Sequence, residues 1–286
     1  MRKTLLITDL DNTLFDWVEV WYRSFSAMLD QIEAISGVSR EILIPEIRAV
    51  HQRHGTSEYA FLIEEVPSLL EFCGGRNPSE VFDQAIDAFR RARKESLRLY
   101  PGVQDTLAEI KHNGVMIVAY TESMAFYTGY RIRKLELDGL IDVLFSPTDH
   151  DLPAGMDRDS MRKYPAENYE FNHTVHKHTP RGAFKPSAEV LRAIVNSTGI
   201  PLGNAVYVGD SLTKDVVMAQ QVGVDNAWAK YGLAQQRAEY QLLRDVTHWT
   251  DDDVQREREI QSIDVKPTIV LCQSFSEIIS HFTFGG

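Results

Sequence analysis

The chain has little cysteine and no long apolar run. Its two cysteines, Cys73 and Cys272, stand far apart in 286 residues, so they indicate neither a disulfide framework nor a cysteine-based zinc site. The apolar run Leu5-Leu6-Ile7 near the start ends before Asp9. A signal peptide needs about 7–15 apolar residues and a membrane span about 18 or more. We therefore expect a cytoplasmic protein that does not associate with membranes.

Positive charge is also scarce, with 30 lysines and arginines against 41 acidic residues and a net charge of −11. Nucleic-acid binding needs a basic surface, so the composition argues against a nucleic-acid partner, although a small anionic substrate can still occupy a locally positive pocket. Hydrophobic residues make up 43% of the chain, which is ordinary for a globular protein. The length predicts about two domains.

Apolar segments and helical segments alternate through most of the chain. Segments with a helical spacing of apolar residues separate continuous apolar runs, which are typical of strands buried on both faces. The pattern predicts an α/β fold with a doubly wound, Rossmann-like parallel sheet. The expected strands are residues 4–10, 115–120, 143–145, 205–208, 226–228 and 268–272.

One all-helical segment interrupts this alternation near the start. Between residues 17 and 97, apolar side chains recur every three or four positions, and glycines mark the breaks between helices. We therefore expect a discontinuous core domain made of residues 1–15 and 99–286. Residues 16–98 would form an all-helical domain inserted into this core.

A second insertion, residues 149–181, is polar and aromatic and has no helical period. Residues 169–175 alternate, which favours a hairpin strand. Three histidines, His173, His176 and His178, raise the alternative of a zinc site, but they lack a cysteine or a clear fourth ligand, so a polar hairpin is the better interpretation. Because the insertion follows the end of a predicted strand, we expect it to form part of the pocket wall or a lid.

Two groups of carboxylates follow predicted strands. The first is Asp9-Leu10-Asp11-Asn12-Thr13, and the second is Gly209-Asp210-Ser211 with Asp215 on the next helix. Ligands bind at the carboxyl ends of strands in open α/β sheets, where one acid can attack or bind metal while another handles a proton. Acidic turns are the alternative. Carboxylates gathered at one edge favour a hard cation such as Mg²⁺ between them.

Two further polar residues stand at matching places. Lys185 precedes a predicted helix, where its charge would balance the acids and a phosphate; a solvated surface lysine is the alternative. Thr121 follows the strand at 115–120 and places a hydroxyl at the same sheet edge. A helix N-cap is the alternative for this threonine.

Taken in order, these elements resemble the haloacid dehalogenase (HAD) superfamily. The resemblance covers roughly residues 1–15 and 99–230, and the helical segment after the first motif takes the position of the family's cap domain. It implies a core of the HAD type with an all-helical cap at residues 16–98. The matches to the four family motifs are Asp9-x-Asp11-x-Thr13, Thr121, Lys185, and Gly209-Asp210-Ser211 with Asp215.

The resemblance implies a magnesium-dependent phosphotransfer site. Asp9 would attack the phosphorus and form an aspartyl phosphate. Asp11 would protonate the leaving alkoxide and then deprotonate the water that cleaves the intermediate. Thr121 would hydrogen-bond a phosphoryl oxygen, and Lys185 would offset charge on the nucleophile and the phosphate.

The resemblance also implies a Mg²⁺ site. Its ligands would be Asp9, the backbone carbonyl of Asp11, and Asp210. Asp215 would bind the ion through water or orient Lys185. The supporting residues are Asp215, Ser211 and Thr13.

The second aspartate separates branches of the superfamily. Phosphatases and phosphomutases have a carboxylate at the position of Asp11, whereas dehalogenases lack one, so the resemblance favours phosphoryl chemistry. Two positions depart from the family pattern: Glu122 stands where asparagine is frequent, and Asn12 replaces the usual glycine. A negative charge beside a phosphate is unfavourable, so we expect Glu122 to point away from it.

We therefore expect a phosphatase that hydrolyses a small phosphorylated metabolite. A phosphomutase of the same fold is the first alternative, and a binding or regulatory protein without turnover is the second. Phosphoglycolate, sugar phosphates and nucleoside monophosphates all stay open as substrates. In the helical domain, five side chains near Gly55 are candidates for substrate contact, with a solvated helix end as the alternative: Arg48, His51, Arg53, His54 and Tyr59.

Overall fold

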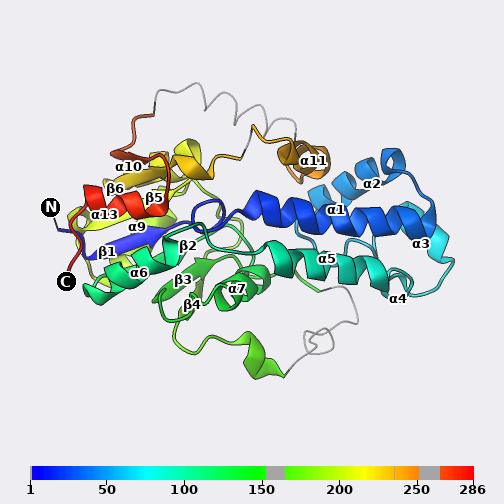
Figure 1. The fold of residues 1–286 in the computed structure, drawn as a ribbon, viewed down its shortest axis with the longest axis horizontal. Coiled ribbons are helices and arrows are strands. Elements are labelled where there is room, and N and C mark those ends of the chain that lie inside the picture. The colour runs from blue at the N-terminus through cyan, green and yellow to red at the C-terminus, as the bar shows by residue number, and fades with distance from the viewer. Residues whose placement is uncertain (1, 153–164, 235, 251–264) are drawn as a thin grey trace. The chain divides into compact units, whose positions relative to one another are not determined.

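A computed structural model describes residues 2–152, 165–234, 236–250 and 265–286 (Figure 1). The chain divides into two compact units. The core unit holds Met1–Asp16, Arg98–Leu233 and Ile263–Gly286, and the helical unit holds Trp17–Leu97 and Ala234–Ser262.

The described part of the core unit contains a seven-stranded sheet in the order β4-β3-β2-β1-β5-β6-β7. Every neighbouring pair of strands is parallel, which confirms the predicted doubly wound α/β fold. The strands are β1 (Leu5–Thr8), β2 (Met116–Tyr120), β3 (Val143–Ser146), β4 (Val175–His178), β5 (Ala205–Gly209), β6 (Asp225–Ala229) and β7 (Ile269–Leu271).

The central strands are apolar throughout because both faces of the sheet are buried. Leu5 and Ile7 of β1 join a hydrophobic cluster with side chains of α9 (Ala188–Thr198) and α10 (Val217–Val222). Successive side chains of a strand point to opposite faces, and the intervening Leu6 is fully buried as well. This two-sided burial explains why the strands read as continuous apolar runs rather than as alternating ones.

The strand order reverses beside β1. From β1 the chain reaches β2, β3 and β4 on one side and then crosses to β5 on the other. Such a reversal opens a crevice at the carboxyl ends of the strands, where ligands of open α/β sheets bind. The part of the core unit that the structure describes also holds the helices α6 (Val103–His112), α7 (Ala125–Lys134) and α13 (Ile278–His281). Its short turns are η1 (Ala166–Tyr169), η2 (Leu202–Asn204), η3 (Leu212–Val216), η4 (Lys230–Gly232) and η5 (Phe275–Glu277).

The helical unit is built around α1 (Trp17–Ser36), whose buried residues Trp21, Phe25, Leu29 and others recur on one face. As a whole, α1 packs mainly against α5 (Asp83–Ser96). The other helices in the described residues of this unit are α2 (Arg40–His54), α3 (Pro67–Cys73), α4 (Pro78–Val81) and α11 (Glu239–Val246).

The segment after residue 233 differs from our expectation. We assigned it to the core domain, but α11 packs on α1 and α2 and groups with the helical unit. Its buried residues Tyr240, Leu243 and Val246 follow a helical period. The period predicts an amphipathic helix, but it carries no information about which of two units that helix covers.

The expected hairpin in the second insertion is wrong, because β4 runs parallel to β3 with Val143 opposite Val175. Asp138, in the turn between α7 and β3, accepts hydrogen bonds from the backbone N–H groups of Asn172, His173 and Thr174. These bonds hold the start of β4 beside the start of β3, so the two strands must run in the same direction. Residues 153–164 of this insertion lie outside the described part of the chain.

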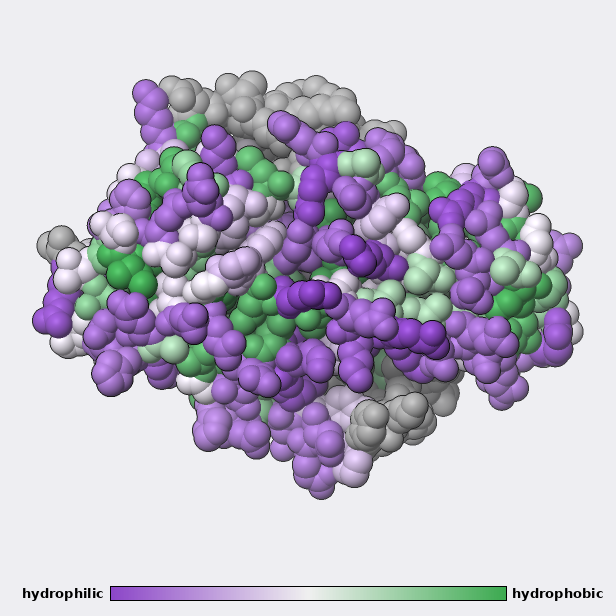
Figure 2. All heavy atoms as spheres, in the orientation of Figure 1, coloured by the Kyte–Doolittle hydropathy of each residue, from purple (hydrophilic) through white to green (hydrophobic). Residues whose placement is uncertain are grey.

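Large apolar side chains are seldom exposed. On the face drawn in Figure 2, hydrophilic residues predominate and apolar residues form separate patches. No described helix is long and apolar enough to cross a membrane. Among the residues that the structure describes, the exposed large hydrophobic ones are Ile42, Leu70, Phe126, Val175, Phe184 and Leu233.

Candidate active site

Asp9 follows β1 at the centre of the sheet, and its side chain is buried. Its Oδ1 accepts a 2.6 Å hydrogen bond from Lys185 Nζ, and its Oδ2 accepts one of 3.3 Å from Thr13 Oγ1. Burial raises the pKa of Asp9 to about 7; Lys185 opposes this rise, and the charges of Asp215 and Asp11 add to it. A carboxylate in this position is stabilised by further positive charge.

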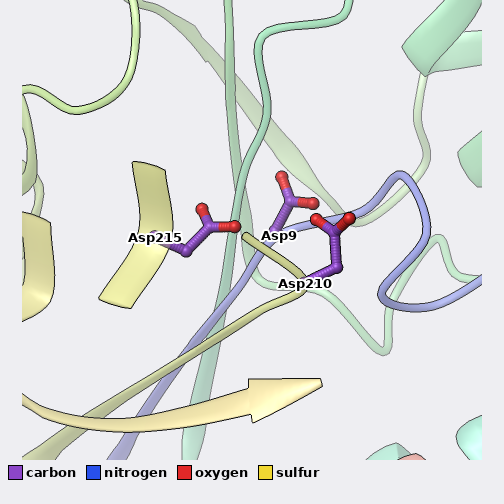
Figure 3. A group of neighbouring side chains, drawn as sticks. All are labelled: Asp9, Asp210 and Asp215. Carbon is purple, nitrogen blue, oxygen red and sulfur yellow. The ribbon is translucent and has the colours of Figure 1, made fainter. Parts of the chain in front are cut away.

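Three carboxylates, Asp9, Asp210 and Asp215, each place an oxygen within 4.8 Å of the others. They come from the end of β1, the residue after β5, and η3, and their side chains converge in Figure 3. Burial, followed by the charges of Asp215 and Asp9, raises the pKa of Asp210 well above its usual value. A donor set made only of carboxylate oxygens, with mutual repulsion that a hard cation would relieve, fits Mg²⁺.

The Asp215 carboxylate reaches this cluster because position 209 is glycine. A Cβ at Gly209 would lie 2.3 Å from Asp215 Cγ. Asp215 is fixed by Ser211, whose backbone N–H donates to Oδ2 at 3.1 Å, and by the Tyr207 hydroxyl, which donates to Oδ1 at 2.9 Å. Ser211 also begins η3, where its hydroxyl accepts from the backbone N–H of Lys214. Ser211 and Tyr207 therefore hold the Asp215 carboxylate within the cluster.

Lys185 joins two of the carboxylates. Its Nζ donates to Asp9 at 2.6 Å and to Asp215 at 3.0 Å. Its side chain is buried, and Nζ lies 4.9 Å from the ring centroid of Tyr120 and 5.6 Å from that of Tyr207. Burial alone would lower the pKa of Lys185, but Asp215 and Asp9 raise it well above its usual value. The Lys185 side chain is thus a charged ammonium at neutral pH.

Asp11 lies apart from the carboxylate cluster. Its Oδ2 accepts from Thr121 Oγ1 at 3.2 Å and from Ser123 Oγ at 2.6 Å, and its Oδ1 accepts from Arg131 Nη1 at 3.3 Å. Thr121, expected to face a phosphoryl oxygen, therefore donates to Asp11 in this structure. Sequence reasoning missed Ser123 and Arg131; Ser123 stood beside Thr121, but nothing marked Arg131 within α7.

The loop after β1 is also held by residues of η4. Asn12 has a φ of 57°, a left-handed conformation that asparagine tolerates better than most residues. The Tyr231 hydroxyl donates to the carbonyl of Thr13 at 2.6 Å, and a Cβ at Gly232 would lie 1.7 Å from the Asn12 carbonyl oxygen. Tyr231 and Gly232, both missed from the sequence, thus fix the loop that carries Asp11.

Four of the five candidate residues of the helical unit contact groups of the same unit. His51 is buried, its Nδ1 lies 2.7 Å from the last backbone carbonyl of α11, and burial lowers its pKa to about 4. Arg53, His54 and Tyr59 all reach the carboxylate of Glu65, at 2.7, 2.9 and 2.6 Å. His51 therefore has a structural position, and Arg53, His54 and Tyr59 form one polar cluster around Glu65.

The described part of the second insertion lines a cavity of about 420 Å³ with the start of α7. His176 Nε2 lies 2.8 Å from Ser146 Oγ, and burial lowers the pKa of His176 to about 4. The cavity wall includes none of the four predicted catalytic residues. The side chains that line it include Phe126, Arg133, Asp149, Tyr169, Phe171, His176 and His178.

The fold agrees with comparisons to known proteins. The family model of haloacid dehalogenase-like hydrolases matches residues 3–223, so the chain belongs to this family, as its sequence motifs predicted. The chain is 24% identical over 238 residues to a glyceraldehyde 3-phosphate phosphatase of Pyrococcus furiosus, covering 81% of this chain and 82% of the relative.

Two solved structures share the fold. The 2-haloacid dehalogenase of Pseudomonas syringae pv. Tomato DC3000 matches with a TM-score of 0.54 and 19% identity, covering 98% of this chain and 97% of that one. The HAD hydrolase YfnB of Bacillus subtilis, bound to magnesium, matches with a TM-score of 0.52 and 15% identity, covering 98% of both chains.

Proposed function

We propose that the chain is a Mg²⁺-dependent phosphatase that hydrolyses a small phosphomonoester through an aspartyl-phosphate intermediate on Asp9. The observation that carries this proposal is the arrangement around Asp9. Its buried carboxylate receives a 2.6 Å hydrogen bond from Lys185 and lies within 4.8 Å of two further carboxylates. This combination supplies a nucleophile, a fixed cation and a set of metal ligands at one sheet edge.

In the first step, a carboxylate oxygen of Asp9 forms a bond to phosphorus while the bond to the leaving oxygen breaks. Asp11 gives its proton to that oxygen, which leaves as an alcohol. In the second step, Asp11 takes a proton from water as the water oxygen attacks phosphorus, and the bond between Asp9 and phosphorus breaks to release phosphate.

Positive charge in the site would stabilise the anionic phosphoryl group while it is transferred. Lys185 contributes a fixed ammonium, and Mg²⁺, held by Asp9, Asp210 and the backbone carbonyl of Asp11, would supply the positive charge that the phosphoryl group needs. Such neutralisation, with positioning, provides most of the catalysis in phosphoryl transfer. Asp215 would act through Lys185, which it contacts at 3.0 Å.

The similarity to a glyceraldehyde 3-phosphate phosphatase supports a small phosphorylated metabolite as substrate. The carboxylate at position 11 supports the same class, because proton transfer to an alkoxide needs an acid there. We propose that the substrate is a soluble metabolite. We also propose that the protein has no nucleic-acid or membrane partner, in agreement with its net charge of −11.

The test is phosphate release from a panel of phosphorylated metabolites, with Mg²⁺ and with EDTA. Asp9→Asn and Asp11→Asn are expected to lower kcat by at least about 10³-fold, and EDTA should abolish release. Asp105→Asn, on the exposed surface of α6, removes the same charge elsewhere and should leave release unchanged. Release that survives Asp9→Asn would refute the mechanism. Bisphosphate-dependent isomerisation in place of release would identify a phosphomutase.

A further inference from the structure

Glu122 directly follows Thr121 at the end of β2, where a phosphoryl site would disfavour a carboxylate. The structure shows where this charge goes. Glu122 Oε1 accepts a 2.8 Å hydrogen bond from the backbone N–H of Lys185, and Oε2 accepts one of 2.7 Å from Lys214 Nζ. Both carboxylate oxygens are therefore used by groups from two other segments of the site.

These contacts close a ring. Glu122 holds the backbone of Lys185, and Lys185 Nζ donates to Asp215 at 3.0 Å. Asp215 is the neighbour of Lys214 on η3, and Lys214 Nζ returns to Glu122. The ring joins the segments after β2, before α9 and after β5, so its members constrain one another. We call the two hydrogen bonds made by the Glu122 carboxylate the Glu122 bridge.

The bridge also balances charge. Burial alone would raise the pKa of Glu122, but Lys214 first and Lys185 second outweigh it, and the pKa is lowered. Lys214 is affected in the opposite sense, because Glu122 raises its pKa against the effect of burial. Both groups are thus ionised at neutral pH, and the ion pair removes the net charge that Glu122 alone would add to the site.

A solvated surface pair is the simpler interpretation, because the side chains of Lys214 and Glu122 are 37% and 26% exposed. An isolated ion pair on the surface contributes little to stability. The Glu122–Lys214 pair is not isolated, because Glu122 also accepts a hydrogen bond from the backbone N–H of Lys185. The side chain of Lys185 is only 3% exposed and contacts Asp9. The partners are 92 residues apart, so the pair connects distant segments and is not a local helix pair.

We propose that Glu122 is a positioning residue that holds Lys185 in place for Asp9, and that Lys214 neutralises it so that the site accepts an anion. The role rests on the proposed phosphatase function. Glu122 would touch neither the substrate nor the metal. It would act by fixing the main chain from which the Lys185 ammonium reaches Asp9.

Four variants separate the two parts of this role. Glu122→Gln keeps an acceptor for the Lys185 N–H and loses the charge, whereas Glu122→Met loses both. Lys214→Met leaves the Glu122 charge unbalanced, and the double variant Glu122→Gln/Lys214→Met restores a neutral pair. Lys134→Met, an exposed lysine on α7, controls for the loss of a positive charge elsewhere.

Steady-state hydrolysis of para-nitrophenyl phosphate gives the first readout. Glu122→Met should lower kcat by about 10- to 100-fold while Glu122→Gln stays within about threefold of the wild type. Lys214→Met should raise KM about tenfold, and the double variant should return KM close to the wild-type value. Equal kcat and KM in all variants, with only the melting temperature lowered, would show a purely structural pair and overturn the proposal.

Amide hydrogen exchange at Lys185, followed by NMR, gives a readout independent of turnover. Exchange should accelerate at least about tenfold in Glu122→Met and stay slow in Glu122→Gln. Unchanged exchange in Glu122→Met would overturn the positioning role. If the wild type releases no phosphate from any substrate, the phosphatase function fails; accelerated exchange in Glu122→Met, with weaker binding of inorganic phosphate by Lys214→Met, would then still support the bridge.

Discussion

Arg131 Nη1 lies 3.3 Å from Asp11 Oδ1 and 3.0 Å from Ser123 Oγ, so a buried arginine of α7 holds the carboxylate proposed as the proton donor. Its side chain is only 3% exposed. Removing one partner of a buried charge pair leaves the other without compensation. Arg131 therefore links the orientation of Asp11 to the packing of α7.

We expect Arg131→Met to lower kcat about tenfold or more, because Asp11 keeps only its two hydroxyl donors. Arg131→Lys, which retains the charge, should recover part of this loss. Arg133→Met is the matched control, because Arg133 lies on the same helix and its Nη1 donates to the backbone carbonyl of Tyr169. Full activity of Arg131→Met in the phosphate-release assay would contradict a role for this contact.

Gly209→Ala tests the close approach of Asp215 to the backbone after β5. A methyl group at this position would lie 2.3 Å from Asp215 Cγ and 2.5 Å from its Cβ, so η3 or the side chain must shift. Overpacking of this kind costs about 1–3 kcal/mol, and the displaced Asp215 would lose its hold on Lys185.

Urea unfolding and phosphate release measure the two consequences of Gly209→Ala. Asp215→Asn provides the comparison, because it removes the charge without crowding the backbone. We expect activity to fall in both variants and stability to fall more in Gly209→Ala. A fully stable and active Gly209→Ala protein would show that the close approach has no role.

The sequence was sufficient for the parts of the fold that follow a local rule. Strands buried on both faces are continuous apolar runs, and the acids that end β1 and β5 meet because neighbouring parallel strands end at one edge. The direction of β4 could not be predicted in this way. It depends on Asp138, whose carboxylate binds backbone N–H groups some 35 residues later in the chain.

In the site, too, residues marked by a motif could be predicted, whereas residues brought in by the packing of the fold could not. Asp9, Lys185, Asp210 and Asp215 meet in the structure at positions that their motifs marked. Arg131 carries no motif, and its contact with Asp11 depends on how α7 packs. Lys214 gave no signal either, because a lysine on a short helix is usually solvated, and only the fold brings it to Glu122.

His51 predicts a pH dependence of stability in the helical unit. Burial lowers its pKa from 6.5 to about 4, so the unfolded chain binds a proton between these pH values that the folded chain excludes. The contribution of His51 to the free energy of unfolding is therefore fully present above about pH 6.5 and is lost as the pH falls toward 4. At about 1.36 kcal/mol for each pKa unit, the loss reaches about 3 kcal/mol.

His51→Gln keeps a donor for the backbone carbonyl and cannot titrate. Urea unfolding from pH 7.5 to 4.5 should therefore show a smaller loss of stability in this variant than in the wild type. The pKa of His176 is lowered as well, so the His51→Gln protein should still lose some stability as the pH falls. Parallel pH profiles of the two proteins would exclude His51 as a source of the dependence.

Leu243→Ala tests the assignment of α11 to the helical unit. Leu243 is buried, and α11 packs on α1 and α2, so truncation should destabilise that unit by about 2–5 kcal/mol. Hydrogen exchange read by mass spectrometry should accelerate in peptides from α1 and α2 and stay slow in peptides from β5. Leu191→Ala, in the hydrophobic cluster of the core unit, should give the opposite pattern. Acceleration in β5 caused by Leu243→Ala would place α11 with the core after all, because a cavity weakens first the contacts that line it.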